Sequence, residues 1–401
     1  MNSLLFALLR ALRGHVWLRL LAFAFILSSL GNGLTQVVVF GQLLRWQASP
    51  TTLTLAWLLA TVPGFLGSLI GERLCRTYPP LRLLICCELL GLLALILPLQ
   101  GLRHHSIPLL LAVQSVEALL AGMSWPALAL TFKRGLSEQE LPAATAMENL
   151  IFASQVLLGT GVGVLLFERV SPQSLLIVDA MSFLAASWLL WLTLQRTEIA
   201  ADDSRPKTRT PLRWTTLTLS QKRSLLLLPS LAAVGAPAMA LLPALAQQMH
   251  PDDTAGLALP LLFSRSLGQL CGPMLLNSRK MPEYVERNRL LLGCLGIFLL
   301  AYVIMPMLSG FTAAALGAIF IAHLASNVVF ALGTFSVLHQ FTEDDVSAAS
   351  AKAWRWQTLS ATLATSITVI LTSQLGAIYT LWCVSFCALL LVGSVLFRYR
   401  T

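Results

Sequence analysis

Long apolar stretches, each about as long as a bilayer is thick, follow one another along almost the whole of this 401-residue chain. A membrane-spanning helix needs roughly 20 mostly apolar residues, and all its backbone polar groups are hydrogen-bonded internally. Charged residues make up only 11% of the sequence, which excludes an ordinary soluble enzyme, a nucleic-acid-binding domain and a secreted disulfide scaffold. The sequence predicts an all-α integral membrane protein with twelve spans, near residues 16–43, 53–71, 81–101, 107–132, 143–168, 173–195, 224–248, 255–277, 288–308, 311–337, 348–373 and 375–397.

The distribution of Lys and Arg supports this number of spans, because these residues collect in cytoplasmic loops. With the N-terminus inside, 23 of the 27 lie on the inner side, and Arg45, Arg103 and Arg169 lie on the outer side. The remaining one, Arg265, falls within the eighth span. A missed or extra span would invert every loop that follows it. We therefore expect twelve spans with both termini in the cytoplasm.

The longest polar stretch, residues 196–223, divides the chain into two sets of six spans and is predicted to be a cytoplasmic linker. A basic turn after the second span recurs about 205 residues later, after the eighth, which is consistent with two parallel repeats. Residues 1–14 predict a short amphipathic helix on the inner surface. We expect two six-helix bundles, over residues 15–195 and 224–401.

Four short stretches of the sequence stand out: LSSLGN at 27–32, ERLCRT at 72–77, GTGVG at 159–163 and DAMSF at 179–183. They resemble stretches of major facilitator superfamily transporters, most closely the drug and siderophore exporters of the macrolide-efflux and enterobactin-exporter branch. Asn32 stands where relatives often have Asp, and ERLCRT keeps a carboxylate, an Arg and a later Arg. The topology is similar over the whole chain, while the motifs lie mainly in its first half.

The resemblance implies a 6+6 architecture in which spans 1, 4, 7 and 10 line a substrate cavity with spans 2, 5, 8 and 11 beside them. In this arrangement we expect Glu72, Arg73 and Arg76 to gate the inner side, although a basic loop without a gating role is an equally simple reading. The span 5 glycines are explained either by this family or by ordinary helix packing. The side chains predicted to face the cavity are Arg265, Gln269, Asn32, Gln36, Gln114, Trp125, Gln155 and Asn327.

Ionisable side chains inside a bilayer are costly, so each one is a functional hypothesis. Glu117 in the fourth span is the leading candidate for a proton site, and His323 and Asp179 are further candidates. Arg265 is predicted to anchor a carboxylate or another anion, because a guanidinium binds such groups with two parallel hydrogen bonds.

Each of these residues also has a purely structural interpretation. Glu117 and Arg265 would then form a permanent ion pair, or Glu117 would bond Gln114. His323 would pack between helices with its ring hydrogen-bonded, and Asp179 would bond backbone or helix-end groups on a supporting helix. Trp125 would mark the membrane interface.

The sequence contains no phosphate-binding glycine loop, ATPase pattern or metal-ligand spacing, so we expect no enzyme activity, no cofactor and no metal site. We predict a secondary exporter of a small amphipathic or anionic molecule, with a siderophore-like natural product favoured, working by proton antiport and alternating access. Multidrug efflux of hydrophobic drugs, a lipid or lysolipid flippase and a non-transporting scaffold are the alternatives. The expected partners are a small-molecule substrate, protons and the lipid bilayer, with no nucleic acid, for a monomer in a bacterial inner membrane.

Overall fold

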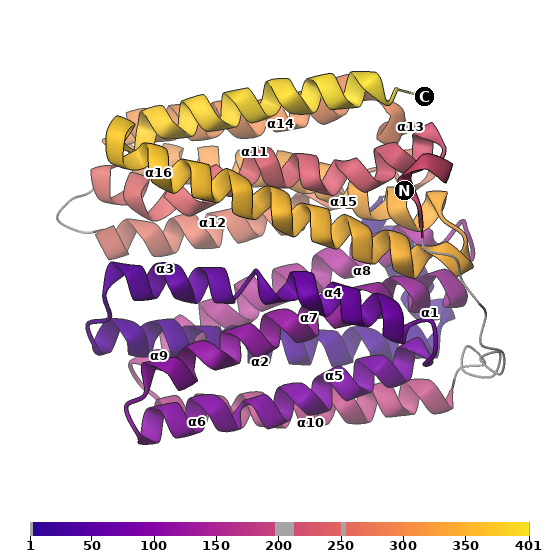
Figure 1. Cartoon of the computed structure of the whole chain (residues 1–401), viewed down its shortest axis with the longest axis horizontal. Coiled ribbons are helices and arrows are strands. Elements are labelled where there is room, and N and C mark those ends of the chain that lie inside the picture. The colour runs from indigo at the N-terminus through magenta and orange to yellow at the C-terminus, as the bar shows by residue number, and fades with distance from the viewer. Residues whose placement is uncertain (1–2, 197–211, 250–253, 401) are drawn as a thin grey trace. The chain divides into compact units, whose positions relative to one another are not determined.

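The computed structural model describes residues 3–196, 212–249 and 254–400, and every regular element within them is a helix (Figure 1). Most of the predicted linker, residues 197–211, lies outside the described residues. The elements are α1 (Leu4–Gly14), α2 (Val16–Arg45), α3 (Pro50–Leu59), α4 (Pro63–Leu74), α5 (Pro80–Ala94), α6 (Ile96–Arg103), α7 (Ile107–Gly135), α8 (Leu141–Ser154), η1 (Gln155–Thr160), α9 (Gly161–Phe167), α10 (Pro172–Gln195), η3 (Trp214–Thr216), α11 (Leu219–Met249), α12 (Thr254–Met274), η4 (Ser278–Lys280), α13 (Met281–Glu286), α14 (Asn288–Ile304), η5 (Met305–Leu308), α15 (Thr312–Gln340) and α16 (Glu343–Arg398).

Nine helices among the described residues are long and apolar enough to cross a bilayer. One of them, α16, has a kink at Gly376, where φ is 76° and ψ is 167°, so it covers the last two predicted spans. A positive φ of this kind is open to glycine at little cost. The second predicted span is divided between α3 and α4. The number of twelve spans stays a prediction.

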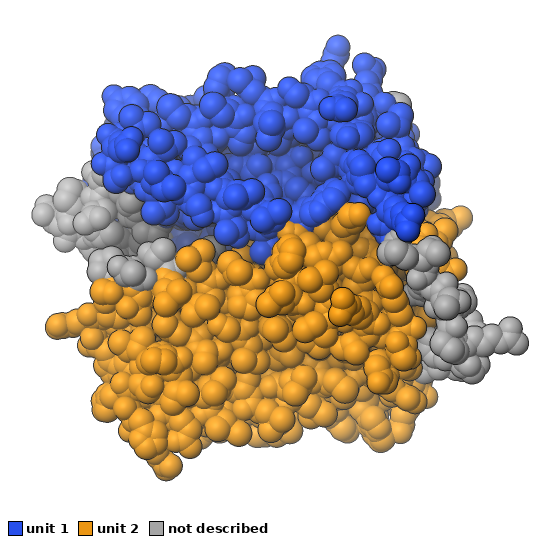
Figure 2. Space-filling view, viewed as in Figure 1, with its two compact units in different colours: residues 1–7, 212–341, 356–401 blue, residues 8–211, 342–355 orange. Residues whose placement is uncertain are grey.

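The chain forms two compact units, shown in different colours in Figure 2. Unit 1 consists of residues 1–7, 212–341 and 356–401, and unit 2 consists of residues 8–211 and 342–355. Helices α1 and α16 each contribute to both units, because α1 starts in unit 1 and α16 starts in unit 2. The bundle boundaries expected from the sequence stay a prediction.

In unit 2, helix α2 packs closely against α10 and against η1, a π-helical turn. A Cβ at Gly31 would lie 2.0 Å from Asp179 Oδ1 and 2.1 Å from Ser182 Oγ. On another side of α2, a Cβ at Gly33 would lie 2.5 Å from the Cα of Gly159. Three of the four stretches that carry the family resemblance therefore form one packing cluster around α2.

Helices α4 and α7 of unit 2 also meet through glycines. A Cβ at Gly67 would lie 1.9 Å from the carbonyl oxygen of Leu119, and one at Gly71 would lie 2.5 Å from that of Met123. Real Cβ atoms do not approach other atoms this closely, so the two helix backbones pack at a distance that only glycine permits at these positions.

Unit 1 repeats this contact between α12 and α15. A Cβ at Gly268 would lie 2.3 Å from the carbonyl oxygen of Phe320, and one at Gly272 would lie 2.2 Å from that of Leu324. Each of these four residues lies 201 positions after its counterpart in unit 2. The same helix contact, built from the same residue spacing, therefore occurs once in each unit.

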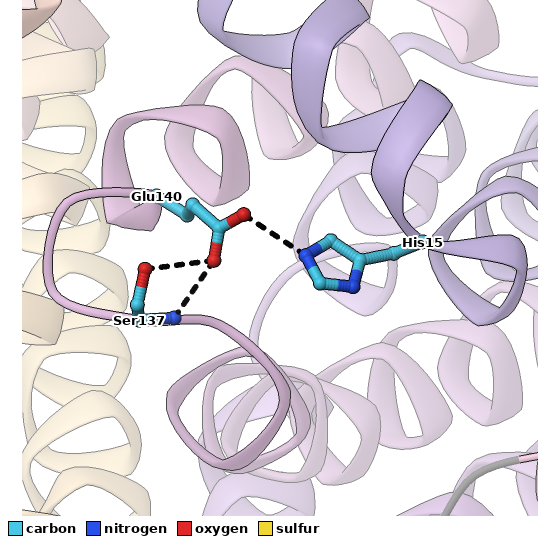
Figure 3. Close-up of polar contacts among 3 residues, drawn as sticks. All are labelled: His15, Ser137 and Glu140. Atoms are coloured by element: carbon cyan, nitrogen blue, oxygen red, sulfur yellow. Dashed lines mark hydrogen bonds and ion pairs between the residues drawn. The ribbon is translucent and has the colours of Figure 1, made fainter.

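The first long helix of each unit is anchored near its start in a different way. In unit 2, His15 immediately precedes α2, and its Nε2 lies 2.9 Å from Glu140 Oε1; Ser137 donates to the other carboxylate oxygen through its backbone N–H and its hydroxyl (Figure 3). In unit 1, the fully buried Arg223 of α11 donates to the carbonyl oxygens of Val285 and Leu396. These acceptors lie at the carboxyl ends of α13 and α16, where a cation also stabilises the helix dipole.

Candidate functional site

Asp179 is completely buried in unit 2, where α10 packs on α2. Its Oδ2 accepts a hydrogen bond from Thr35 Oγ1 at 2.5 Å, and its Oδ1 accepts one from Ser182 Oγ at 3.1 Å. The close approach of Gly31 leaves room for this carboxyl group between the two helices. Asp179, predicted as a proton-coupling candidate, therefore also joins α10 to α2.

Two further carboxylates lie near Asp179 in unit 2. Asp179 interacts electrostatically with Glu88 of α5, which Ser28 hydrogen-bonds, and with Glu117 of α7. None of the three forms an ion pair with any residue that the structure describes, and Glu117 Oε1 and Glu88 Oε2 are buried without a hydrogen-bond partner there. A group of carboxylates without a cation can bind and release protons.

The other predicted cavity residues of unit 2 lie on three elements. Asn32 and Gln36 are half-buried, one turn apart on α2. Gln114 is buried on α7 on the same face as Glu117, and its Nε2 has no hydrogen-bond partner among the described residues. Gln155 begins η1, and π-helical turns of this kind are frequent at functional sites.

Two of the three predicted gating residues, Glu72 and Arg76, form an ion-pair cluster at the end of α4. Glu72 Oε1 lies 2.8 Å from Arg76 Nη2, and Glu72 Oε2 lies 2.8 Å from Nη2 of Arg355 on α16. The side chains of Glu72 and Arg355 are each only 13% exposed, so this pair is poorly screened by water. Arg73 is exposed. Arg355 was not among the predicted gating residues; its basic side chain near the start of a predicted span was the available signal.

Further contacts join the same turns of α16 to α7 within unit 2. Arg134 Nε lies 2.8 Å from Glu343 Oε1. Trp125 packs against Trp354 with ring centroids 4.9 Å apart. Trp125, predicted to face the cavity, is thus in contact with another indole. Ion pairs of Glu343 and Arg355 and this aromatic contact join residues 342–355 to the rest of unit 2.

In unit 1, Arg265 of α12 lies beside a buried pair formed by Tyr302 of α14 and His323 of α15. The Tyr302 hydroxyl and His323 Nε2 are 2.8 Å apart, and both side chains are at most 2% exposed. Arg265 interacts electrostatically with both residues. Tyr302 was not predicted from the sequence, although a phenol within an otherwise apolar span was a signal for it.

Several polar atoms of this cluster in unit 1 have no hydrogen-bond partner among the residues that the structure describes. They are Arg265 Nε, His323 Nδ1 and Gln269 Oε1, all buried. Asn327, by contrast, donates to the carbonyl oxygen of His323 one turn earlier on α15. Arg265 also forms no ion pair with a described carboxylate. A half-buried guanidinium whose buried Nε–H has no partner is suited to binding an anion.

The predicted residues therefore fall into two sets. Unit 2 holds the carboxylates, the amides of α2 and α7, and the loop cluster at Glu72, whereas unit 1 holds Arg265, Gln269, His323 and Asn327. Within residues 3–196, 212–249 and 254–400, no group of three or more His, Cys, Asp or Glu side chains is arranged to hold a metal ion.

Comparison with solved structures identifies the fold. The chain is similar to a bacterial homologue of the iron transporter ferroportin in an outward-facing state, with a TM-score of 0.73, 15% identity, and coverage of 96% of this chain and 99% of that one. It is similar to the fucose:proton symporter of Escherichia coli, with a TM-score of 0.64, 13% identity, and coverage of 96% and 98%. It is also similar to the human organic anion transporter MFSD10, with a TM-score of 0.67, 14% identity, and coverage of 94% and 99%.

Among curated proteins, 74 residues of this chain are 61% identical to an uncharacterized 29.9 kDa protein in the crtE 3' region of Pseudescherichia vulneris. This match covers 18% of this chain and 27% of that protein, so the chain spans about a quarter of its relative's length. The family model described as Major Facilitator Superfamily matches residues 21–365. The chain therefore belongs to the major facilitator superfamily and has the fold of a membrane transporter.

Proposed function

We propose that this protein is a secondary active exporter of a small amphipathic or anionic molecule, with a siderophore-like, carboxylate-bearing natural product as the favoured substrate. It works by alternating access and proton antiport, with twelve spans in a 6+6 arrangement and both termini in the cytoplasm of a bacterium. Its place is the inner membrane, and it acts as a monomer. The superfamily transports small molecules with the free energy of ion or substrate gradients.

The observation that carries this proposal is the guanidinium of Arg265 in unit 1, whose buried Nε has no hydrogen-bond partner among the described residues. Arg265 lies beside Tyr302 and His323 and has no carboxylate partner among the described residues. An uncompensated charge in a bilayer is expensive, so such a residue persists where a ligand or water supplies the missing contacts. A hydrophobic drug would supply none of them, whereas a substrate carboxylate would form charge-assisted hydrogen bonds.

The carboxylates of unit 2 support proton coupling. Glu117 and Glu88 are each repelled by Asp179 when both partners are ionised, so protonation of Asp179 or of its neighbour relieves that repulsion. Asp179 is already held by Thr35 and Ser182. Glu117, with a buried oxygen that no described residue hydrogen-bonds, remains the leading proton site.

The ion pairs on α16 support gating by the loop after α4. Glu72 holds Arg355 and Arg76 at once, so it fixes the start of α16 against α4 within unit 2. Breaking this ion pair would remove one of the contacts that hold the start of α16, alongside those of Glu343 and Trp354, and such a change can bias a switch between two states. The packing cluster of α2, α10 and η1 favours the exporter branch, because three of its four characteristic stretches are in contact there.

The experiment is uptake into inside-out vesicles containing the full chain, using radiolabelled carboxylate siderophores and neutral hydrophobic drugs, with and without a proton gradient. We expect gradient-dependent uptake of the carboxylates, loss of the gradient dependence in Glu117→Gln, and loss of uptake in Arg265→Gln. Glu168→Gln is the matched control, because the Glu168 side chain is 82% exposed. Uptake of neutral drugs in preference to carboxylates, or of fluorescent lysolipid instead, would contradict the proposal.

A further inference from the structure

Two residues of the cluster around Arg265 correspond to glycines in unit 2. The residues 201 positions before Arg265 and His323 are Gly64 and Gly122. In unit 2 these two glycines bring α4 and α7 together, since a Cβ at Gly122 would lie 2.2 Å from the carbonyl oxygen of Gly64. Unit 1 keeps the neighbouring glycine contacts, at Gly268 and Gly272. At the positions that match Gly64 and Gly122, however, it carries two large polar side chains.

Arg265 and His323 lie on helix faces that meet. Gly268 is three residues after Arg265, so the two share a face of α12, and a Cβ at Gly268 would lie 3.2 Å from the Cβ of His323. Gln269 is one turn after Arg265 and is also buried. Arg265, Gln269 and His323 therefore present polar atoms to the same region between α12 and α15.

The Tyr302 hydroxyl determines which His323 nitrogen carries a proton. The hydroxyl is fully buried, and His323 Nε2 is its hydrogen-bond partner in the part of the chain that the structure describes. A buried O–H that did not donate would lose a hydrogen bond, so the phenol donates and Nε2 accepts. A neutral imidazole that accepts at Nε2 carries its proton on Nδ1, and that atom is buried without a partner among the described residues.

This leaves two donors, Arg265 Nε–H and His323 Nδ1–H, and one acceptor, Gln269 Oε1, that no described residue pairs. Two donors match the two oxygens of a carboxylate, and the acceptor matches an O–H or N–H next to it. A simple carboxylate would leave Gln269 unpaired, and a neutral amide would form weaker bonds with Arg265.

We propose that Arg265 and His323 form a carboxylate site in unit 1, that Tyr302 fixes His323 as a donor, and that Gln269 selects ligands with a hydroxyl or amide N–H beside the carboxylate. This inference rests on the proposed function and adds to it a ligand class and two residues that set specificity. Tyr302 is a positioning residue, because it acts on the ligand through His323.

The test is equilibrium binding by titration calorimetry to the purified full chain in detergent. The probes are mandelate, phenylacetate, which lacks the hydroxyl, and mandelamide, which lacks the charge. We expect mandelate to bind roughly 10-fold more tightly than phenylacetate and mandelamide not to bind measurably, because an unpaired buried acceptor and a lost charge-assisted bond each cost about this much or more. In Gln269→Leu the two acids should bind equally.

Variants of His323 and Tyr302 distinguish failure of this inference from failure of the proposed function. His323→Leu and Tyr302→Phe should each weaken mandelate binding about 10-fold, and His323→Asn should recover part of it, since its amide keeps a donor near the Nδ1 position. If Arg265→Gln abolishes binding while Tyr302→Phe and His323→Leu bind normally, the donor role of His323 is wrong and the anion exporter stands. Failure of wild type to bind either acid overturns the carboxylate site itself.

The protonation of His323 can also be measured in the wild-type protein, so this test remains if the variants used for binding fail to fold. With ¹⁵N-labelled histidine, the ring nitrogens of His323, assigned by the loss of signal in His323→Asn, should show a protonated Nδ1 and an accepting Nε2 at neutral pH. Tyr302→Phe should reduce this preference. A protonated Nε2 with a bare Nδ1 in wild type would overturn the inference.

Discussion

At Gly64 and Gly122 unit 2 brings two helix backbones into contact, whereas the matching positions of unit 1 hold Arg265 and His323. The neighbouring contact at Gly67 in unit 2 and Gly268 in unit 1 is the same in both. Two units can therefore share the glycine spacing that packs their helices and differ in one layer of side chains. At these two positions the side chains differ between the units while the helix packing stays the same, so new binding chemistry can arise there without a change of fold.

The intramembrane ionisable side chains differ in the same way. Unit 2 carries the carboxylates Glu88, Glu117 and Asp179, while unit 1 carries Arg265 and His323. Neither set is neutralised by an ion pair with a described residue of its own unit. This difference is the basis for the proposed division of roles, in which unit 2 would bind the proton and unit 1 the anion.

The largest expected effect concerns the packing that both units share. Gly67→Ala and Gly268→Ala should each destabilise the protein by about 3 kcal/mol, because the new methyl group would meet a backbone carbonyl that cannot move aside. Thermal unfolding in detergent, followed by tryptophan fluorescence, measures this. Gly293→Ala is the control, since no atom lies within 4 Å of its Cβ position. Equal melting temperatures for the three variants would refute a shared packing contact.

The next effect concerns the anchor of the first helix of unit 1. Arg223→Met should cost about 2 kcal/mol, because it leaves the buried carbonyl of Val285 without its donor and removes a charge from two helix ends. Arg223→Lys should cost less, and the exposed Arg289 provides a neutral control as Arg289→Met. A melting temperature unchanged in Arg223→Met would mean that the buried guanidinium does not anchor α11.

A moderate effect is expected for an ion pair found in unit 2. The position of unit 1 that matches Glu72 is Pro273, which cannot form such a pair. Glu72→Gln and Arg355→Gln should each lower stability, and the double variant should lose about 1 kcal/mol less than their sum, because both single variants break the same contact. Transport rates in vesicles should show the same coupling. Strict additivity would show that the two side chains act independently.

The smallest effect concerns the anchor of the first helix of unit 2. Partial burial raises the pKa of Glu140, but hydrogen bonds from His15 and Ser137 outweigh it and hold the pKa below its ordinary value. The carboxylate therefore stabilises the fold above the ordinary carboxyl range, and this contribution disappears as the pH falls through the lowered pKa. Because the pair is more than a third exposed on the glutamate side, the contribution is small.

Melting temperatures of wild type and Glu140→Gln between pH 4 and pH 8 measure this contribution. Wild type should be slightly more stable above about pH 5, and the difference should shrink in acid. A difference that grows as the pH falls would contradict the assigned direction. The loss of stability in Glu140→Gln should be smaller than that in Arg223→Met, because the Glu140 anchor is half-exposed and the Arg223 anchor is buried.

The sequence predicted the membrane class, because long apolar runs and the Lys and Arg distribution need no knowledge of tertiary contacts. It also identified Arg265 and His323 as intramembrane polar residues, and the glycines at 159–163 as a packing stretch. It did not connect Gly31 to Asp179, nor Glu72 to Arg355, which is 283 positions later in the sequence. Periodicity and composition report which residues share one helix, whereas contacts between helices depend on how those helices pack.

The contact of Tyr302 shows the same limit. No motif surrounds this tyrosine in the sequence, and its 2.8 Å contact with His323 appears only in the structure. The repeat offset of 201 positions, by contrast, is contained in the sequence, because it aligns Gly67 and Gly71 with Gly268 and Gly272. The same offset pairs Arg265 and His323 with glycines, so the difference between the two units can be found from residue spacing alone.

The division of roles between the units is tested most directly by counting the protons released when the purified transporter binds mandelate, in weakly buffered detergent with a pH indicator. Wild type should release protons on binding, Glu117→Gln should bind mandelate with less or no release, and Arg265→Gln should neither bind nor release. Proton release unchanged in Glu117→Gln, or mandelate binding unchanged in Arg265→Gln, would contradict the assignment of the proton to unit 2 and the anion to unit 1.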